Sequence, residues 1–498
     1  MSIIFVLIPI LAAIAILCGC KARLTALIAS GLTLILGLGS VFCWKAEVWS
    51  VTLQVLSKPS IHLAMGFYDG MSLIMVLLSV LVLFTAVFAG KAPEGREKLY
   101  YSSILLIGAG GLGAFLSTDL FFFYAFHELA LVPTFLMIGM LGTGERKEAA
   151  WKITIYLALG SIILLAGLIW LVSASGSDTW LFKDLLASNI DPKAQTGIAA
   201  LLIVGFGVLI SLFPFHSWAA PAYAAAPAPV AMLHAGVLKK FGLFGLIRLY
   251  PMVSLGMQDW LGWLIVLLLC NILWVGFVTI NQKRLDMMLG NSSVMHMGYI
   301  FLAFAALVQA GGAEENPIAI PAAVVLMFAH GISIALLFLL TDVVRQKTGT
   351  VELAELGGLA KSAPRLAFLF GLAGMASIGL PGLANFSGEV LVFLSGFENY
   401  KGESLGCVQV ATILALWGVV ISAVYMLRAY RQTFQGPAVS VTESAKDLKL
   451  SDQIPAIILA AALLVVGLYP NSLLSHLKKP PCCSECDQST EQAEQAEQ

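Results

Sequence analysis

Charged residues are scarce in this sequence. They make up 11% of the 498 residues, whereas a soluble domain carries roughly 25%. Hydrophobic residues make up 59%, and the mean hydropathy is +0.91. These values exclude an ordinary water-soluble fold and indicate a polytopic membrane protein. The net charge is −1, so nothing in the charge balance indicates nucleic acid as a partner.

Other features are missing as well. No basic residue precedes the first apolar run, whereas a cleaved signal peptide carries positive charge there, so we expect a retained first span. No nucleotide, phosphate or metal motif occurs. The glycine-rich piece LLIGAGGLGAFLS lies in an apolar run with no strand before it, which is the wrong context for a dinucleotide loop. We therefore expect no cofactor and no metal in this chain, which can move protons but cannot itself oxidise a substrate.

What the sequence does contain is a series of apolar runs long enough to cross a bilayer as helices. We predict an all-α polytopic membrane protein with about fourteen transmembrane helices. The predicted spans are 2–18, 24–43, 71–90, 100–118, 120–141, 154–174, 197–215, 229–250, 259–280, 287–309, 318–342, 365–397, 408–430 and 453–470.

The distribution of lysine and arginine predicts the orientation. Eighteen of the 28 lie after odd-numbered spans, eight lie after even-numbered spans, and the remaining two are Lys239 and Lys240. By the positive-inside rule the odd side is cytoplasmic, which places both termini on the outer, periplasmic side. The polar tail, 471–498, is predicted to be disordered. Its Cys482, Cys483 and Cys486 lack a fixed fourth metal ligand, and a disulfide there is left open.

Proline and glycine interrupt two predicted spans. Pro214 lies in the seventh and Pro381 in the twelfth, five spans later. Matched interruptions in two halves are typical of transporters built from repeats. We predict two inverted five-helix repeats, helices 4–8 and 9–13, with two unrelated prolines as the alternative. The predicted units are 1–99 (helices 1–3), 100–250 and 259–430 (the repeats), 431–470 (a loop and helix 14) and 471–498 (the tail).

Ionisable residues inside the spans are the candidate functional residues, because a charge at mid-membrane costs several kcal/mol unless it is paired or hydrated. Glu128 lies in helix 5, Lys239 and Lys240 in the middle of helix 8, and Glu389 after the break in helix 12. The histidines in or near spans are His216 and His234 (the helix 7–8 break), His296 (helix 10) and His330 (helix 11). A chain of such groups is what proton transfer through a bilayer requires.

These candidates have structural alternatives. Lys239 can snorkel to an interface, and the histidines can be ordinary buried hydrogen-bonding groups. Because neighbours on a helix point about 100° apart, we expect Lys240 inside the bundle and Lys239 less central. Asp69, Asp119 and Asp342 lie at predicted helix ends, where capping or anchoring is the expected role.

Several stretches resemble one known family. They are FHELALVP, FPFHSW, AGVLKKFGLFGLIR, NQKRLDMMLGNSSVMHMGY, FAHGISIALLFL and GLPGLANFSGE. They are similar to the antiporter-like membrane subunits of respiratory complex I (NADH-quinone oxidoreductase), most of all to the subunit M or chain 4 type, over roughly 60–435. The resemblance implies fourteen helices, inverted repeats and broken helices 7 and 12. It also implies a proton relay of Glu128, Lys240, His330 and Glu389, while Lys239, His234, His216 and His296 are weaker candidates.

The resemblance also implies partners and leaves rival functions open. The partners are other membrane and peripheral subunits, which hold NADH, FMN, iron–sulfur clusters and quinone, in a bacterial inner membrane. The alternatives are an Mrp-type cation/proton antiporter subunit and a non-pumping scaffold. Leu209 keeps the scaffold open, because relatives carry a helix 7 lysine there that pairs with the helix 5 glutamate. Lys239, His127 or His216 are the candidates to replace that lysine.

Overall fold

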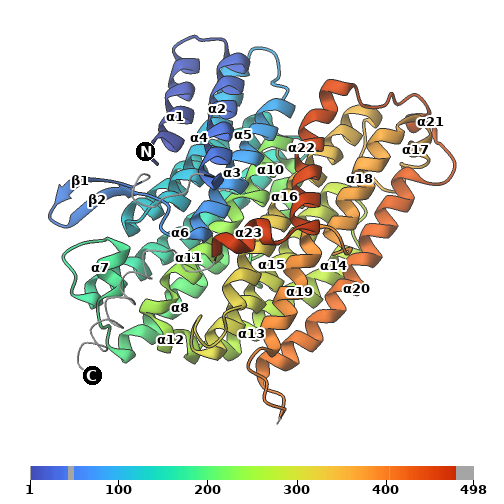
Figure 1. The fold of residues 1–498 in the computed structure, drawn as a ribbon. Helices are drawn as coiled ribbons and strands as arrows, with labels where there is room; N and C mark the ends of the chain where they lie inside the picture. The colour runs from blue at the N-terminus through green and yellow to red at the C-terminus, as the bar shows by residue number, and fades with distance from the viewer. Residues whose placement is uncertain (1, 43–49, 403, 478–498) are drawn as a thin grey trace.

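The structure is a computed structural model that describes residues 2–42, 50–402 and 404–477. Figure 1 shows long helices side by side in one bundle, with a short hairpin projecting from its N-terminal half. The α-helices are α1 (Ile4–Leu17), α2 (Ala22–Phe42), α3 (Gly70–Ala89), α4 (Glu97–Leu116), α5 (Leu120–Leu141), α6 (Arg146–Ser175), α7 (Phe182–Leu186), α8 (Pro192–Ile210), α9 (Ala219–Ala225), α10 (Ala228–Gly236), α11 (Phe241–Leu249), α12 (Ser254–Asp259), α13 (Leu261–Leu269), α14 (Val275–Ile280), α15 (Leu285–Ala310), α16 (Ala319–Thr348), α17 (Leu359–Ser362), α18 (Pro364–Ser377), α19 (Ala384–Phe397), α20 (Cys407–Phe434), α21 (Ser440–Glu443), α22 (Leu450–Leu468) and α23 (Asn471–Leu477). Shorter turns are η2 (Leu238–Lys240) and η3 (Tyr250–Met252), both 3₁₀, and the π-helical η4 (Cys270–Trp274).

The number of membrane spans is close to the predicted fourteen without matching it. Among the described residues, 11 helices are long and apolar enough to cross a membrane, or 12 if α22 and α23, bent by 71°, count as one span. The difference arises where the chain is short or interrupted. Helix α1 has only 14 residues, and the predicted span 365–397 is divided into α18 and α19. The structure is thus that of a polytopic membrane protein, while the fourteen spans and the repeats stay predictions.

The chain is not wholly α-helical. Strands β1 (Val51–Ser57) and β2 (Ser60–Met65) form an antiparallel hairpin in register from Val51 opposite Met65 to Ser57 opposite Ser60, with a shift between Gln54 and Leu56. The sequence analysis missed it because hydropathy windows of span length do not detect short strands. The β-branched residues in this segment favour extended structure.

The first predicted break is present between α8 and α9. Helix α8 ends at Ile210, and the chain returns to helix only at Ala219, since Pro214 has no N–H to donate and its ring crowds the preceding turn. Asn271 of η4 bonds the freed backbone. Its Oδ1 accepts from the Phe213 N–H (2.6 Å), and its Nδ2 donates to the Ser211 carbonyl (3.2 Å). A buried side chain therefore does here what water does for a loop in solution.

The second break lies between α18 and α19, at the other predicted position. Gly379 and Gly382 have φ of +80° and +91°, a backbone region that glycine adopts without strain. The carbonyl of Ser377, the last residue of α18, lies 3.0 Å from His296 Nε2 on α15. In both breaks, then, a side chain from a neighbouring helix bonds the interrupted backbone.

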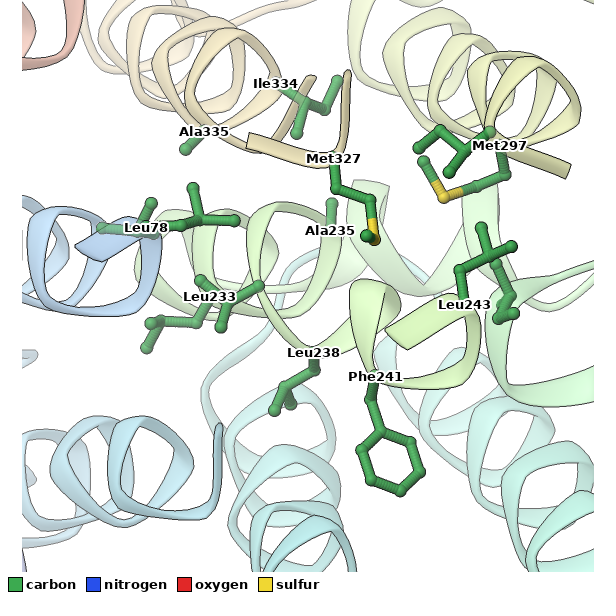
Figure 2. Close-up of a cluster of buried hydrophobic side chains, with 14 of the residues drawn as sticks. Leu78, Leu233, Ala235, Leu238, Phe241, Leu243, Met297, Met327, Ile334 and Ala335 are labelled. Atoms are coloured by element: carbon green, nitrogen blue, oxygen red, sulfur yellow. The ribbon is translucent and has the colours of Figure 1, made fainter. Parts of the chain in front are cut away.

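A third irregularity was not predicted. The expected helix over 229–250 is wrong as a continuous helix, because α10 ends at Gly236 and the turn η2 carries both lysines before α11 begins. The Lys240 ammonium donates to the carbonyl of Ala235 (2.8 Å), next to this break. Residues 229–250 are all buried. Figure 2 shows apolar side chains of the lysine turn and of α3, α10, α11, α15 and α16 gathered in this region.

Of the three aspartates predicted to lie at helix ends, two cap a helix. Asp69 caps α3 by accepting from the Ser72 N–H (2.9 Å), and Asp119 caps α5 by accepting from the Phe121 N–H (2.9 Å). Burial raises the pKa of the Asp119 carboxyl, and the backbone N–H groups that it accepts oppose that shift. The prediction for Asp342 was wrong, because α16 continues past it to Thr348. Residues 471–477, assigned to the tail, form α23, while the three tail cysteines lie outside the described residues.

Candidate functional site

Lys240 and His330 form the centre of the candidate site. The Lys240 Nζ lies 2.8 Å from His330 Nδ1, and the two residues are 0% and 2% exposed. The side chains come from η2 and from α16, which packs against α10. Two positive charges at this distance, out of water, would repel strongly, so the pair holds at most one positive charge. A proton bound by either base is therefore within one hydrogen bond of the other.

His296 continues the site from His330 toward the second helix break. The two imidazole rings lie 5.4 Å apart, centroid to centroid. His296 Nδ1 lies 2.8 Å from the Ser292 carbonyl, and its Nε2 lies 3.0 Å from the Ser377 carbonyl. A neutral imidazole has one N–H and can donate to only one of them. A doubly protonated ring would donate to both carbonyls.

Glu389 lies on α19, beside the second break. It is 4% exposed, and a Cβ built on Gly379 would overlap its Oε2, so the glycine makes room for the carboxyl group. Tyr299 and Tyr425 lie near enough to Glu389 for the charges to interact. The Tyr425 hydroxyl also hydrogen-bonds the Ser292 hydroxyl (2.6 Å). Polar groups thus run from the lysine turn to Glu389.

Lys239 turns away from its neighbour, as expected, but it is not less central. It is 1% exposed and donates to the Ser293 hydroxyl (3.3 Å), with its Nζ 5.6 Å from the centroid of the Tyr223 ring. The Tyr223 hydroxyl lies 3.3 Å from His234 Nδ1. The expectation of a peripheral Lys239 was wrong because protein surrounds this segment on all sides, and every residue from 229 to 250 is buried.

Glu128 is separated from the lysines. Its side chain is one-third exposed, at 33%, accepts a hydrogen bond from the Ser161 hydroxyl and lies 3.3 Å from His127 Nδ1. Within the described part of the chain no lysine forms an ion pair with it. His127 is 4% exposed, and its ring stacks on Phe241, the residue after Lys240, at 4.2 Å between centroids.

Leu209 is the position at which the family resemblance implies a lysine. Leu209 is 3% exposed near the end of α8. Of the three proposed substitutes, His127 contacts Glu128, whereas Lys239 bonds Ser293. His216 lies in the first break, where its ring stacks on Phe213 (5.4 Å), and no hydrogen bond joins it to the other candidates among the described residues.

Sequence reasoning missed several polar side chains that the structure brings to this site. Ser161, Tyr223 and Ser293 are ordinary residues in apolar runs, and nothing marks them in the sequence. Asn271 had a signal, since an amide in the middle of a predicted span is unusual. Asp342 was noticed in the sequence as the last residue of a predicted span, but it was expected to cap or anchor a helix end.

Comparison with known proteins decides the family. Residues 117–415 match the sequence model of the family NADH:quinone oxidoreductase/Mrp antiporter, TM. The chain belongs to this family. It is 32% identical over 439 residues to an NAD(P)H-quinone oxidoreductase chain 4 of Synechococcus sp., covering 86% of this chain and 82% of that protein. A Picosynechococcus chain 4 is 33% identical over 406 residues, covering 81% and 74%.

Solved structures agree with this family. A chain of respiratory complex I from Thermus thermophilus superposes with a TM-score of 0.86 at 27% identity, covering 96% of this chain and 97% of that one. A chain of the Mrp complex from Dietzia sp. gives 0.80 at 22% identity, with 96% and 97% covered. At 22% identity the second likeness shows a shared fold alone.

Proposed function

We propose that this chain is a proton-translocating membrane subunit of an NADH-quinone oxidoreductase, of the chain 4 type. Its family membership and its similarity to chain 4 proteins along most of their length support this. The observation that carries the proposal is the contact between Lys240 and His330, two bases 2.8 Å apart in a fully buried site. A merely structural core gains nothing from a buried lysine, which costs free energy unless its charge is used.

The proton moves along groups of this chain in short steps. It is held between Lys240 and His330, passes to His296 across the two neighbouring rings, and reaches Glu389 at the second break. His296, bonded to two carbonyls, holds the imidazolium while the proton is in transit. Glu389 is the last carboxyl group of this path. Residues 127 and 128 form a separate acid–base pair in the other half, where His127 stands in for the lysine that Leu209 replaces.

The proposed function also implies the partner subunits, the membrane and the orientation of the chain. Electron transfer and quinone chemistry take place in partner subunits, which hold NADH, FMN, iron–sulfur clusters and quinone, and this chain has no redox centre. The chain lies in a bacterial inner membrane beside other antiporter-like subunits. Its lysine- and arginine-rich side faces the cytoplasm, and both termini face the periplasm.

The test is proton pumping per electron, measured with the complete complex purified and reconstituted in liposomes. Lys240→Leu replaces a buried ionisable side chain with an apolar one, a change that tends to preserve or raise stability. We expect the protons pumped per electron to fall while electron transfer continues. Leu238→Met, a volume-conserving change in the same turn, is the matched control and leaves the ratio unchanged.

Two rival functions have their own outcomes in this experiment. Leu209 in place of a lysine favours a non-pumping scaffold, and an unchanged ratio in Lys240→Leu would establish it. The shared Mrp fold favours a cation/proton antiporter subunit. That function requires the chain to purify without NADH-oxidising partners. The subunit composition of the purified complex therefore decides between an antiporter subunit and a subunit of an NADH-quinone oxidoreductase.

A further inference from the structure

A water-accessible cavity opens near the C-terminal end of α16. Its volume is about 420 Å³, and its lining includes Lys91, Asp342, Arg345 and Asp452. These residues belong to the side of the chain predicted to be cytoplasmic. Helix α16 packs against both α10 and α22, and Figure 1 shows the three helices in the middle of the bundle. The cavity lies at the N-terminal end of α10, where Ala228 and Pro229 line it, and the buried lysine turn follows the other end of this helix.

A second, much smaller void continues from this cavity into the protein. It measures about 10 Å³, close to the ~10–15 Å³ that one water molecule needs. Asp342 and Arg345 line both spaces, and the void adds Tyr223 and Thr341. The Thr341 hydroxyl is buried and has no hydrogen-bond partner. Since a buried hydroxyl is rarely left unbonded, this group marks a place for one water between Asp342 and Tyr223.

The groups beyond the void reach the lysines. The Tyr223 hydroxyl lies 3.3 Å from His234 Nδ1, and its ring lies 5.6 Å from the Lys239 ammonium. His234 Nε2 is buried and unbonded, which leaves it open to a proton on its far side. These side chains come from α9, α10 and η2, the segments that connect the cavity to the centre of the bundle.

We propose that Asp342 takes up protons from the cavity and that Tyr223 and His234 pass them to Lys239. The path deepens the function proposed above and rests on it. Asp342 binds a proton from solution and gives it to the water in the small void. The Tyr223 hydroxyl accepts that proton and releases its own to His234 Nδ1, and the imidazole releases one from Nε2 to the Lys239 amine. One proton moves inward, and Asp342 and Tyr223 return to their starting forms. His234 is left with its proton on Nδ1 and has to return to the Nε2–H tautomer before the next transfer.

The ordinary alternative is that Asp342 only balances nearby charge. Its carboxylate accepts from the Gln346 amide (2.6 Å), and Arg345 lies in the same cavity wall. Asp342→Asn removes both the charge and the titratable group, and Asp342→Glu restores both, so these two variants test whether the carboxyl group is needed. Tyr223→Phe separates the two roles, because it leaves the Asp342 carboxylate in place and interrupts only the path.

The experiment measures protons pumped per electron with the complete reconstituted complex. We expect Asp342→Asn and Tyr223→Phe each to lose as large a share of pumping as Lys240→Leu, and Asp342→Glu to recover it. Asp452→Asn is the matched control, because it removes a carboxylate from the same cavity that does not line the small void. Its ratio stays at the wild-type value.

Each remaining outcome contradicts one specific claim. If Lys240→Leu loses pumping while Asp342→Asn keeps it, the function stands and Asp342 is not the uptake residue. If Asp342→Asn loses pumping but Tyr223→Phe does not, the path inward from Asp342 is wrong. If Lys240→Leu itself pumps normally, the proposed function fails first. Assembly of every variant is checked by its subunit composition, and Asp342→Glu covers the case in which Asp342→Asn does not assemble.

Discussion

Replacing Asn271 with alanine removes the side chain that bonds the first helix break. The Phe213 N–H, now 2.6 Å from Asn271 Oδ1, and the Ser211 carbonyl, 3.2 Å from Nδ2, both lose their partner. Asn271 is 0% exposed, so water does not easily replace it. Leaving a buried polar group unbonded costs about 1–3 kcal/mol. Opening of the break should therefore become easier by about 1–3 kcal/mol for each group, which is roughly 5- to 150-fold in population.

Hydrogen exchange of the purified complex, followed by mass spectrometry, measures how often the first helix break opens. Peptides covering residues 211–218 should exchange at least several-fold faster in Asn271→Ala, while peptides from α3 stay unchanged. Asn281→Ala is the matched control, because its amide bonds the Phe277 carbonyl (3.1 Å) at an exposed position. An unaltered exchange rate in the break of Asn271→Ala would show that the break is held by other contacts.

Three further predictions concern the second half of the site and Lys239. Lys239→Leu should lower protons pumped per electron without stopping electron transfer; a normal ratio would make Lys239 a bystander. His296→Leu should lower the same ratio and speed hydrogen exchange in residues 378–383, because the Ser377 carbonyl loses its donor, whereas His296→Gln should keep more protection. Gly379→Ala should destabilise the second break by more than the ~1–2 kcal/mol cost of a left-handed non-glycine residue, since its methyl group also overlaps Glu389. A thermal inactivation half-life equal to that of wild type would refute this.

Hydropathy and proline positions were enough to predict most of the architecture. Long apolar runs must form helices in a bilayer because backbone groups have no other partners there. Pro214 and the glycines near Pro381 end helices for local reasons, so both breaks were predictable. The irregular turn at Lys239 and Lys240 was not, since its sequence is compatible with a regular helix. It depends on tertiary contacts, including the bond from Lys240 to the Ala235 carbonyl.

The candidate site was predictable in its ionisable members and not in their pairing. Lys240 and His330 stood out as charges or titratable groups in apolar runs, but the 2.8 Å contact between them joins residues 90 positions apart. Burial of Lys239 was misjudged because helix geometry gives the direction of a side chain and says nothing about what surrounds the helix. Asp342 was taken for a helix end because the apolar run stops at this residue, whereas helix α16 continues to Thr348.

If Leu209 takes the place of a lysine, as the family resemblance implies, the group left beside Glu128 is His127, whose Nδ1 lies 3.3 Å from the carboxyl oxygen. A lysine beside Glu128 would bring an ammonium group on a flexible stem, whereas the ring of His127 is stacked on Phe241. The carboxyl of Glu128 is also one-third exposed and accepts a hydrogen bond from the Ser161 hydroxyl. Because His127 stacks on Phe241, the residue after Lys240, the pair of residues 127 and 128 is joined to the lysine turn by direct packing. If the proposed relay operates, we expect a substitution of His127 to alter proton pumping through this contact.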